Sequence, residues 1–123
     1  MAPSAGGERL TVLTDHFDTD AMDMLKEVME DEFSELMQVY LDDSDTRLPQ
    51  LFDAVRNADA TTVRELAHSF KGASSNISAA PLAALCLELE MAGKSGDLSS
   101  ADAILGRIEI EYSQVKRLLS DLI

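Results

Sequence analysis

The sequence contains no tryptophan, one cysteine and only three prolines, and aromatic residues make up 5% of its 123 residues. With a single cysteine, Cys86, the chain cannot form an internal disulfide, which fits a reducing compartment. It has no run of 18 apolar residues, and its first ten residues lack the apolar stretch of a signal peptide. We therefore expect a soluble, cytoplasmic protein.

Basic residues are also scarce, because 10 Lys and Arg stand against 23 Asp and Glu and the formal net charge is −13. Such a surface repels phosphate backbones and anionic lipids, so we expect neither nucleic acid nor a membrane as a partner. The charge is uneven: residues 1–60 hold 15 acids and 4 bases, whereas residues 61–123 hold 8 and 6. The second half of the chain is therefore nearly neutral.

The motifs of several enzyme classes are missing. We find no P-loop, no dinucleotide-binding glycine fingerprint, no HExxH and no CxxC. The sequence therefore predicts no ATP site, no metal centre and no cofactor of its own.

The residues that are abundant favour helices. Ala, Leu, Met and Glu are frequent, 46% of the residues are hydrophobic, and no alternating strand pattern occurs. Residues 1–18 carry small and polar residues without periodicity, so we expect a flexible N-terminal segment there and one folded domain over residues 19–123.

Apolar periodicity predicts one short helix followed by four longer ones. Asp18, Thr19 or Asp20 should cap the short helix. The next should cover 31–57, with a kink or break near 45–49 because Pro49 removes a backbone hydrogen bond. A third should run from about 60 to 76. Ser78 should cap a fourth, with Pro81 in its first turn and the GKSG loop at 93–96 at its end, and the last should begin near Ser99 or Ser100. This pattern predicts an all-α fold, an antiparallel four-helix bundle with a short extra N-terminal helix, which we expect to be monomeric.

One stretch of the third helix, AHSFKGASSNIS at residues 67–78, has a glycine in its middle, four residues after one of the two histidines. At about 100° per residue, the apolar stripe of this helix lies almost opposite His68. His68 should therefore be exposed, with Arg64, Gly72 and Ser75 on the same side.

The neighbours of His68 suggest open space and positive charge. A side chain at position 72 would lean toward the helix N-terminus, over His68, and glycine removes it at a cost of about 1 kcal/mol relative to alanine. Lys71 brings an ammonium group within reach of anything attached to the imidazole. Ala73, Ser74 and Ser75 keep the following turn small.

An exposed histidine beside a cation suits a group that accepts a phosphoryl. A neutral imidazole, with a pKa of about 6.5, is a competent nucleophile near pH 7. Phosphoryl transfer depends mainly on alignment and charge stabilisation, which a docked partner could supply with its own metal. Ser69 points about 100° away from His68, which argues against a Ser–His catalytic pair.

The run HSFKGASSNISA, followed by LAALCLELE, resembles the histidine phosphotransfer (HPt) domain of multistep phosphorelays over roughly residues 20–120. The small size and the MEDEF segment at 29–33 resemble the HptB-like subgroup of stand-alone bacterial proteins. One position departs from the family, because Ser78 stands where glycine is usual, and this puts the local turn geometry in doubt.

The resemblance implies a phosphoryl carrier. His68 would be phosphorylated, Lys71 would stabilise the phosphoryl and Gly72 would open the site. Arg64, Ala73, Ser74 and Ser75 would belong to the docking surface. The donor would be the receiver-domain aspartate of a hybrid sensor kinase and the acceptor that of a response regulator, with Mg²⁺ held by the receiver.

Two other functions stay open at this point. A helical adaptor that binds receiver or kinase domains without carrying phosphoryl fits the same bundle and surface. A metal-binding carboxylate bundle is disfavoured, because the paired Glu-x-x-His pattern of such sites is absent. We interpret His16 as inert and Cys86 as a buried apolar residue.

Overall fold

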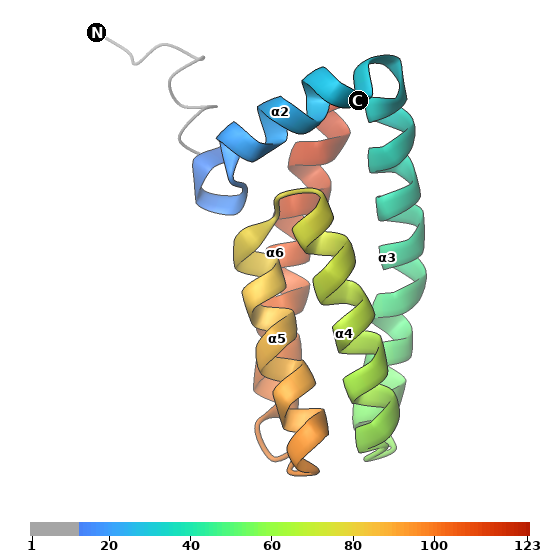
Figure 1. Cartoon of the computed structure of the whole chain (residues 1–123). Coiled ribbons are helices and arrows are strands. Elements are labelled where there is room, and N and C mark those ends of the chain that lie inside the picture. The colour runs from blue at the N-terminus through green and yellow to red at the C-terminus, as the bar shows by residue number, and fades with distance from the viewer. Residues whose placement is uncertain (1–12) are drawn as a thin grey trace, which may run out of the picture.

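The structure of the protein is a computed structural model, which describes residues 13–123. Within that range the regular elements are helices: α2 (Thr19–Met29), the 3₁₀ turn η1 (Glu30–Glu32), α3 (Phe33–Arg56), α4 (Ala60–Asn76), α5 (Ala80–Ser95) and α6 (Ala101–Leu122). Helices α3 to α6 run up and down beside one another, and α2 lies across one end (Figure 1). The predicted four-helix bundle with an extra N-terminal helix is confirmed.

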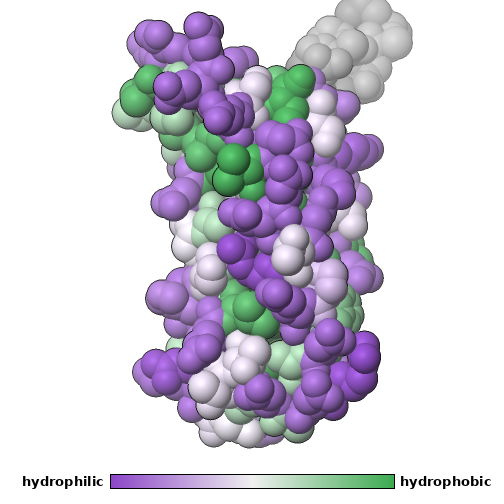
Figure 2. Space-filling model, turned by 90° about the vertical axis from the view of Figure 1, so that its right-hand side faces the viewer, coloured by the Kyte–Doolittle hydropathy of each residue, from purple (hydrophilic) through white to green (hydrophobic). Residues whose placement is uncertain are grey.

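The core is formed by the apolar stripes that the periodicity predicted. Its largest fully buried side chains come from all four bundle helices: Met37, Leu51, Val63, Phe70, Leu82, Leu89, Leu105, Ile108, Val115 and Leu119. Burying an aliphatic or aromatic side chain of this size contributes about 2 kcal/mol, so the bundle is held mainly by these stripes. The outer face of α3, by contrast, is mostly hydrophilic (Figure 2).

Of the kink or break predicted near Pro49, the break is wrong, because the 24-residue helix α3 continues through the proline. Pro49 is exposed, so its ring faces solvent while Ser44 and Leu51 on either side are buried. Near the proline, the Asp45 carboxylate accepts hydrogen bonds from Tyr112 Oη of α6 at 2.8 Å and from Lys116 Nζ. Tertiary contacts hold the helix together where the proline removes a backbone bond.

The segment before α2 is packed onto the bundle, which corrects the prediction that residues 1–18 are flexible as far as residues 13–18 are concerned. Phe17 is 3% exposed and belongs to the core. His16 Nδ1 lies 2.6 Å from Glu111 Oε2 on α6, with both side chains mostly buried, so His16, which we interpreted as inert, has a packing role that the sequence did not indicate. The rest of the predicted flexible segment, residues 1–12, lies outside the described residues.

Asp18 attaches the same segment to α2 and to the turn between α4 and α5. Its carboxylate accepts a hydrogen bond from the Ala21 amide at 3.1 Å and caps α2, one of the predicted caps. Its own amide donates to the carbonyl of Ser78 in the α4–α5 turn at 2.8 Å. The chain before α2 is thus tied both to α6 and to that turn.

Ser78 does not cap α5, contrary to the prediction. It adopts a φ of +67°, in the left-handed region where L-residues are strained, and the N-cap position falls to Ala79. Pro81 does lie in the first turn of α5, as predicted. A glycine, the residue that the resemblance implies at this position, would adopt this φ without strain.

Helices α4 and α5 approach closely where α5 carries Gly93. The loop predicted at 93–96 begins later than expected, because α5 continues to Ser95. Gly96, whose φ is +79°, is its C-cap. A Cβ added at Gly93 would lie 2.7 Å from the amide nitrogen of Arg64 and 2.8 Å from the carbonyl oxygen of Ala60. Only glycine allows the two backbones this distance.

In residues 13–123, no helix combines the length and the apolar character that crossing a membrane requires.

Candidate functional site

His68 lies on α4 with its side chain 68% exposed. Val63, Ala67 and Phe70 of the same helix are fully buried, so the imidazole points away from the core, as the helical periodicity predicted. A shallow hollow beside it is lined by Thr61, Arg64, Glu65, His68 and Glu90.

The residue that orients the imidazole was missed by the sequence reasoning. Glu90 on α5 places Oε2 2.9 Å from His68 Nδ1. A carboxylate only accepts hydrogen bonds, so Nδ1 carries the proton and donates it. In the neutral imidazole Nε2 is then the nitrogen without a proton, and no described residue forms a hydrogen bond with it. A nucleophilic lone pair therefore faces solvent.

Lys71 lies on the same side of α4 as His68 but is not a free cation. Its Nζ is 2.6 Å from Glu90 Oε1, and its side chain is only 28% exposed. The ammonium of Lys71, and to a smaller extent the hydrogen bond from His68, hold the pKa of Glu90 below its ordinary value. One carboxylate thus contacts both predicted site residues, with one oxygen each.

Gly72 is exposed and helical, and open space surrounds it. A Cβ added there would find no heavy atom of residues 13–123 within 4 Å, apart from its own turn of helix. The fold itself therefore does not require glycine at this position. Arg64, one turn before His68, is exposed on the same side and lines the hollow.

The small residues after Gly72 do not all face the same way, which corrects the prediction that Ser74 belongs to the docking surface. Ser74 is 0% exposed, and its Oγ lies 2.9 Å from Tyr40 Oη inside the bundle, so it cannot contact a partner. Ala73 is half-buried against the core, and only Ser75 is exposed. The periodicity of α4 explains this, because Ser74 is four residues from buried Phe70.

Other reactive groups lie apart from His68. Cys86 is fully buried, and burial raises the pKa of its thiol to about 12, which suits a packing residue. Among the described residues, no group of three His, Cys, Asp or Glu is arranged to hold a metal ion.

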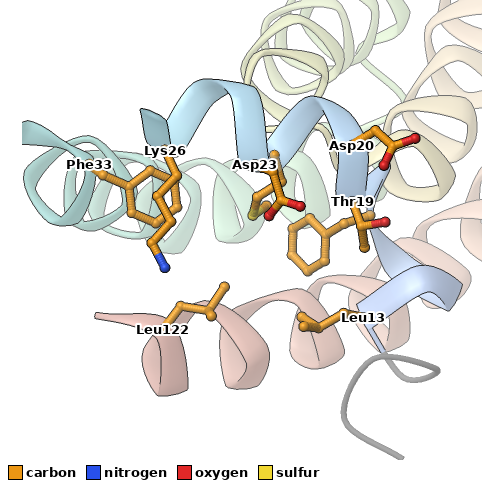
Figure 3. Close-up of a pocket in the computed structure, with 9 residues that line it drawn as sticks. Leu13, Thr19, Asp20, Asp23, Lys26, Phe33 and Leu122 are labelled. Carbon is orange, nitrogen blue, oxygen red and sulfur yellow. The ribbon is translucent and has the colours of Figure 1, made fainter. Parts of the chain in front are cut away.

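A separate pocket lies between α2 and the last turn of α6 (Figure 3). Its walls are mainly apolar, and Lys26 places its ammonium 6.0 Å from the centre of the Phe33 ring. The residues that line it are Leu13, Phe17, Thr19, Asp20, Met22, Asp23, Lys26, Phe33 and Leu122. None of them belongs to the His68 site.

Comparisons with known proteins identify the family of the chain. The model of the Hpt domain family matches residues 35–118. The crystal structure of histidine-containing phosphotransfer protein B (HptB) from Pseudomonas aeruginosa PAO1 is 40% identical, with a TM-score of 0.84 over 86% of this chain and 92% of that one. No curated protein sequence matches.

A more distant structure shares the fold. Histidine-containing phosphotransfer protein MtHPt2 from Medicago truncatula is 22% identical, with a TM-score of 0.81 over 94% of this chain and 83% of that one. The family match covers more than half of the chain and the HptB structure nearly all of it. The chain therefore belongs to the Hpt domain family, is HptB-like, and has a phosphotransfer role in two-component signalling.

Proposed function

We propose that His68 is the residue that carries the phosphoryl group between receiver domains. The observation that supports this most directly is the exposed imidazole whose Nδ1 is hydrogen-bonded to Glu90 at 2.9 Å, which leaves Nε2 as the nucleophile. No second group on the chain has to remove a proton, because Nε2 already holds a lone pair.

In the proposed reaction, the Nε2 lone pair forms a bond to phosphorus while the bond from phosphorus to the aspartyl oxygen breaks. The electron pair of that broken bond returns to the aspartate carboxylate of the receiver. The Nδ1 proton stays on the ring, where Glu90 accepts its hydrogen bond. Mg²⁺ held by the receiver would neutralise the charge of the transferring group.

The docking surface would surround His68 on α4 and extend onto α3. Arg64, Gly72 and Ser75 are exposed on the His68 side of α4. Next to Ser75, a hollow lined by Ala21 of α2 and by Ser78 and the start of α5 continues this surface. Small and apolar residues around a charged centre suit a transient contact of modest area.

The test compares wild type with His68→Gln, after circular dichroism has shown that both are helical. Each protein is mixed with radiolabelled phospho-receiver domains of hybrid kinases from the source organism, and the label is followed on gels. Acid-labile label on wild type and none on His68→Gln is the expected result, because a P–N bond hydrolyses in acid. If receivers bind both proteins equally and label neither, the chain is an adaptor and the carrier proposal fails.

A further inference from the structure

The Glu90 carboxylate is shared between the nucleophile and the cation of the site. Oε2 lies 2.9 Å from His68 Nδ1, Oε1 lies 2.6 Å from Lys71 Nζ, and the Glu90 side chain is only 15% exposed. Both oxygens are thus engaged in a partly desolvated place, where charge-assisted contacts are strong. Lys71 is already paired before any phosphoryl arrives.

A phosphoryl on Nε2 changes the charges around this carboxylate. It brings a charge of about −1.5 to −2 and three acceptor oxygens to the exposed side of the ring. Lys71, three residues along the same helix, is within reach of those oxygens. The ammonium group then has two anionic partners, while Glu90 and the phosphoryl repel each other across the imidazole.

We propose that Glu90 competes with the phosphoryl group for Lys71, and so keeps the phosphorylated state of His68 from becoming too stable to pass its phosphoryl on. This inference rests on the proposed function of His68. In the reverse step, a receiver carboxylate oxygen forms the bond to phosphorus, and the electron pair of the N–P bond returns to Nε2. Glu90 acts as a positioning residue whose charge sets the balance between the two directions.

The test uses a phospho-receiver that transfers its label to the wild-type protein. It measures, at equilibrium, how the label divides between this receiver and the full chain, first for wild type and then for Glu90→Gln. The amide keeps the size of the side chain and can still accept from Nδ1, but it no longer binds Lys71 by charge. We expect the equilibrium to move about tenfold toward phosphohistidine, equivalent to about 1.4 kcal/mol. Phosphohistidine in isolated protein should also hydrolyse more slowly.

Glu88→Gln is the matched control. Glu88 lies on the same helix and pairs with Arg107 at 3.3 Å, away from His68, so its substitution removes one negative charge without touching the site. Its equilibrium should equal that of wild type. An equal shift in Glu88→Gln and Glu90→Gln would assign the effect to net charge and overturn the inference.

Lys71→Met distinguishes two effects of Glu90, namely its competition with the phosphoryl group for Lys71 and its direct repulsion of the phosphoryl group. If Glu90 acts by withholding Lys71, Glu90→Gln should shift the equilibrium less than twofold once Lys71 is gone. A full tenfold shift in that background, or no shift in the single variant, contradicts the inference while the carrier function stands. A wild-type protein that accepts no label from any receiver removes the proposed function as well.

Discussion

Gly72→Ala should change the stability of the fold and the rate of phosphoryl transfer in opposite directions. An alanine in the interior of a helix is favoured over glycine by about 1 kcal/mol, and the added methyl would meet no described atom within 4 Å. We therefore expect the free energy of unfolding to rise by about 0.5–1 kcal/mol. For a chain of this length the thermal midpoint should rise by about 3 °C.

The rate of phosphoryl transfer to His68 should fall in the same variant. The methyl lies on the exposed side of α4, one turn after His68, where a docked receiver has to bring phosphorus within about 3 Å of Nε2. We expect Gly72→Ala to accept phosphoryl about tenfold more slowly and Gly72→Gln more slowly still, since a longer side chain leans back over His68. The measurements are urea unfolding followed by circular dichroism and the initial rate of label transfer.

Two other helical glycines are the controls. A Cβ at Gly106 on α6 also meets no described atom within 4 Å, so Gly106→Ala should gain similar stability and transfer normally. Gly93→Ala should lose stability, because its methyl would meet the α4 backbone below 3 Å. If Gly72→Ala transfers as fast as Gly106→Ala, or is less stable than wild type, the explanation of this glycine is wrong.

Three further predictions follow from contacts away from the imidazole. Ser78→Gly should raise the free energy of unfolding by about 1 kcal/mol in urea, because it relieves a φ of +67°; an unchanged value would contradict strain there. Tyr40→Phe and Ser74→Ala should each cost about 1–2 kcal/mol by unpairing a buried hydroxyl, while the double variant should cost less than their sum in the same assay. Cys86, with its raised pKa and full burial, should react with a thiol reagent only as fast as the protein unfolds; fast reaction in buffer would show an accessible thiol.

The sequence predicted the helices well and their ends less well. Periodic apolar residues gave α4 its bounds of 60–76, because a single face of the helix is buried. Pro49 misled, since local propensity says nothing of the Tyr112 and Lys116 contacts that hold α3 to α6. The packing of Phe17 was missed because a single aromatic residue in a polar stretch forms no repeating apolar pattern from which burial could be predicted.

The candidate site could be predicted only where it lies on one helix. His68, Lys71 and Gly72 are related by the turn of α4, so their spacing carried the information. Glu90 comes from another helix, 22 residues later, and its contact depends on how α5 packs on α4. A weak signal existed, because Glu90 lies four residues after buried Cys86 and so at the edge of the buried stripe of α5. The prediction for Ser74 was wrong for a different reason. Its small size suggested a place on the docking surface, but its helical spacing from Phe70 puts it on the buried face of α4.

The close approach at Gly93 has a consequence for how the protein can vary. Glu90 and His68 each lie one turn from Gly93 and Arg64, where the backbones of α5 and α4 come into contact, and this contact helps to fix the spacing of the two helices beside the site. Helices α4 and α5 carry His68, Lys71, Gly72 and Glu90, whereas the proposed docking surface extends onto α3. Substitutions of core side chains on α6 can therefore change the thermal stability of the bundle while the spacing of His68 and Glu90 stays the same.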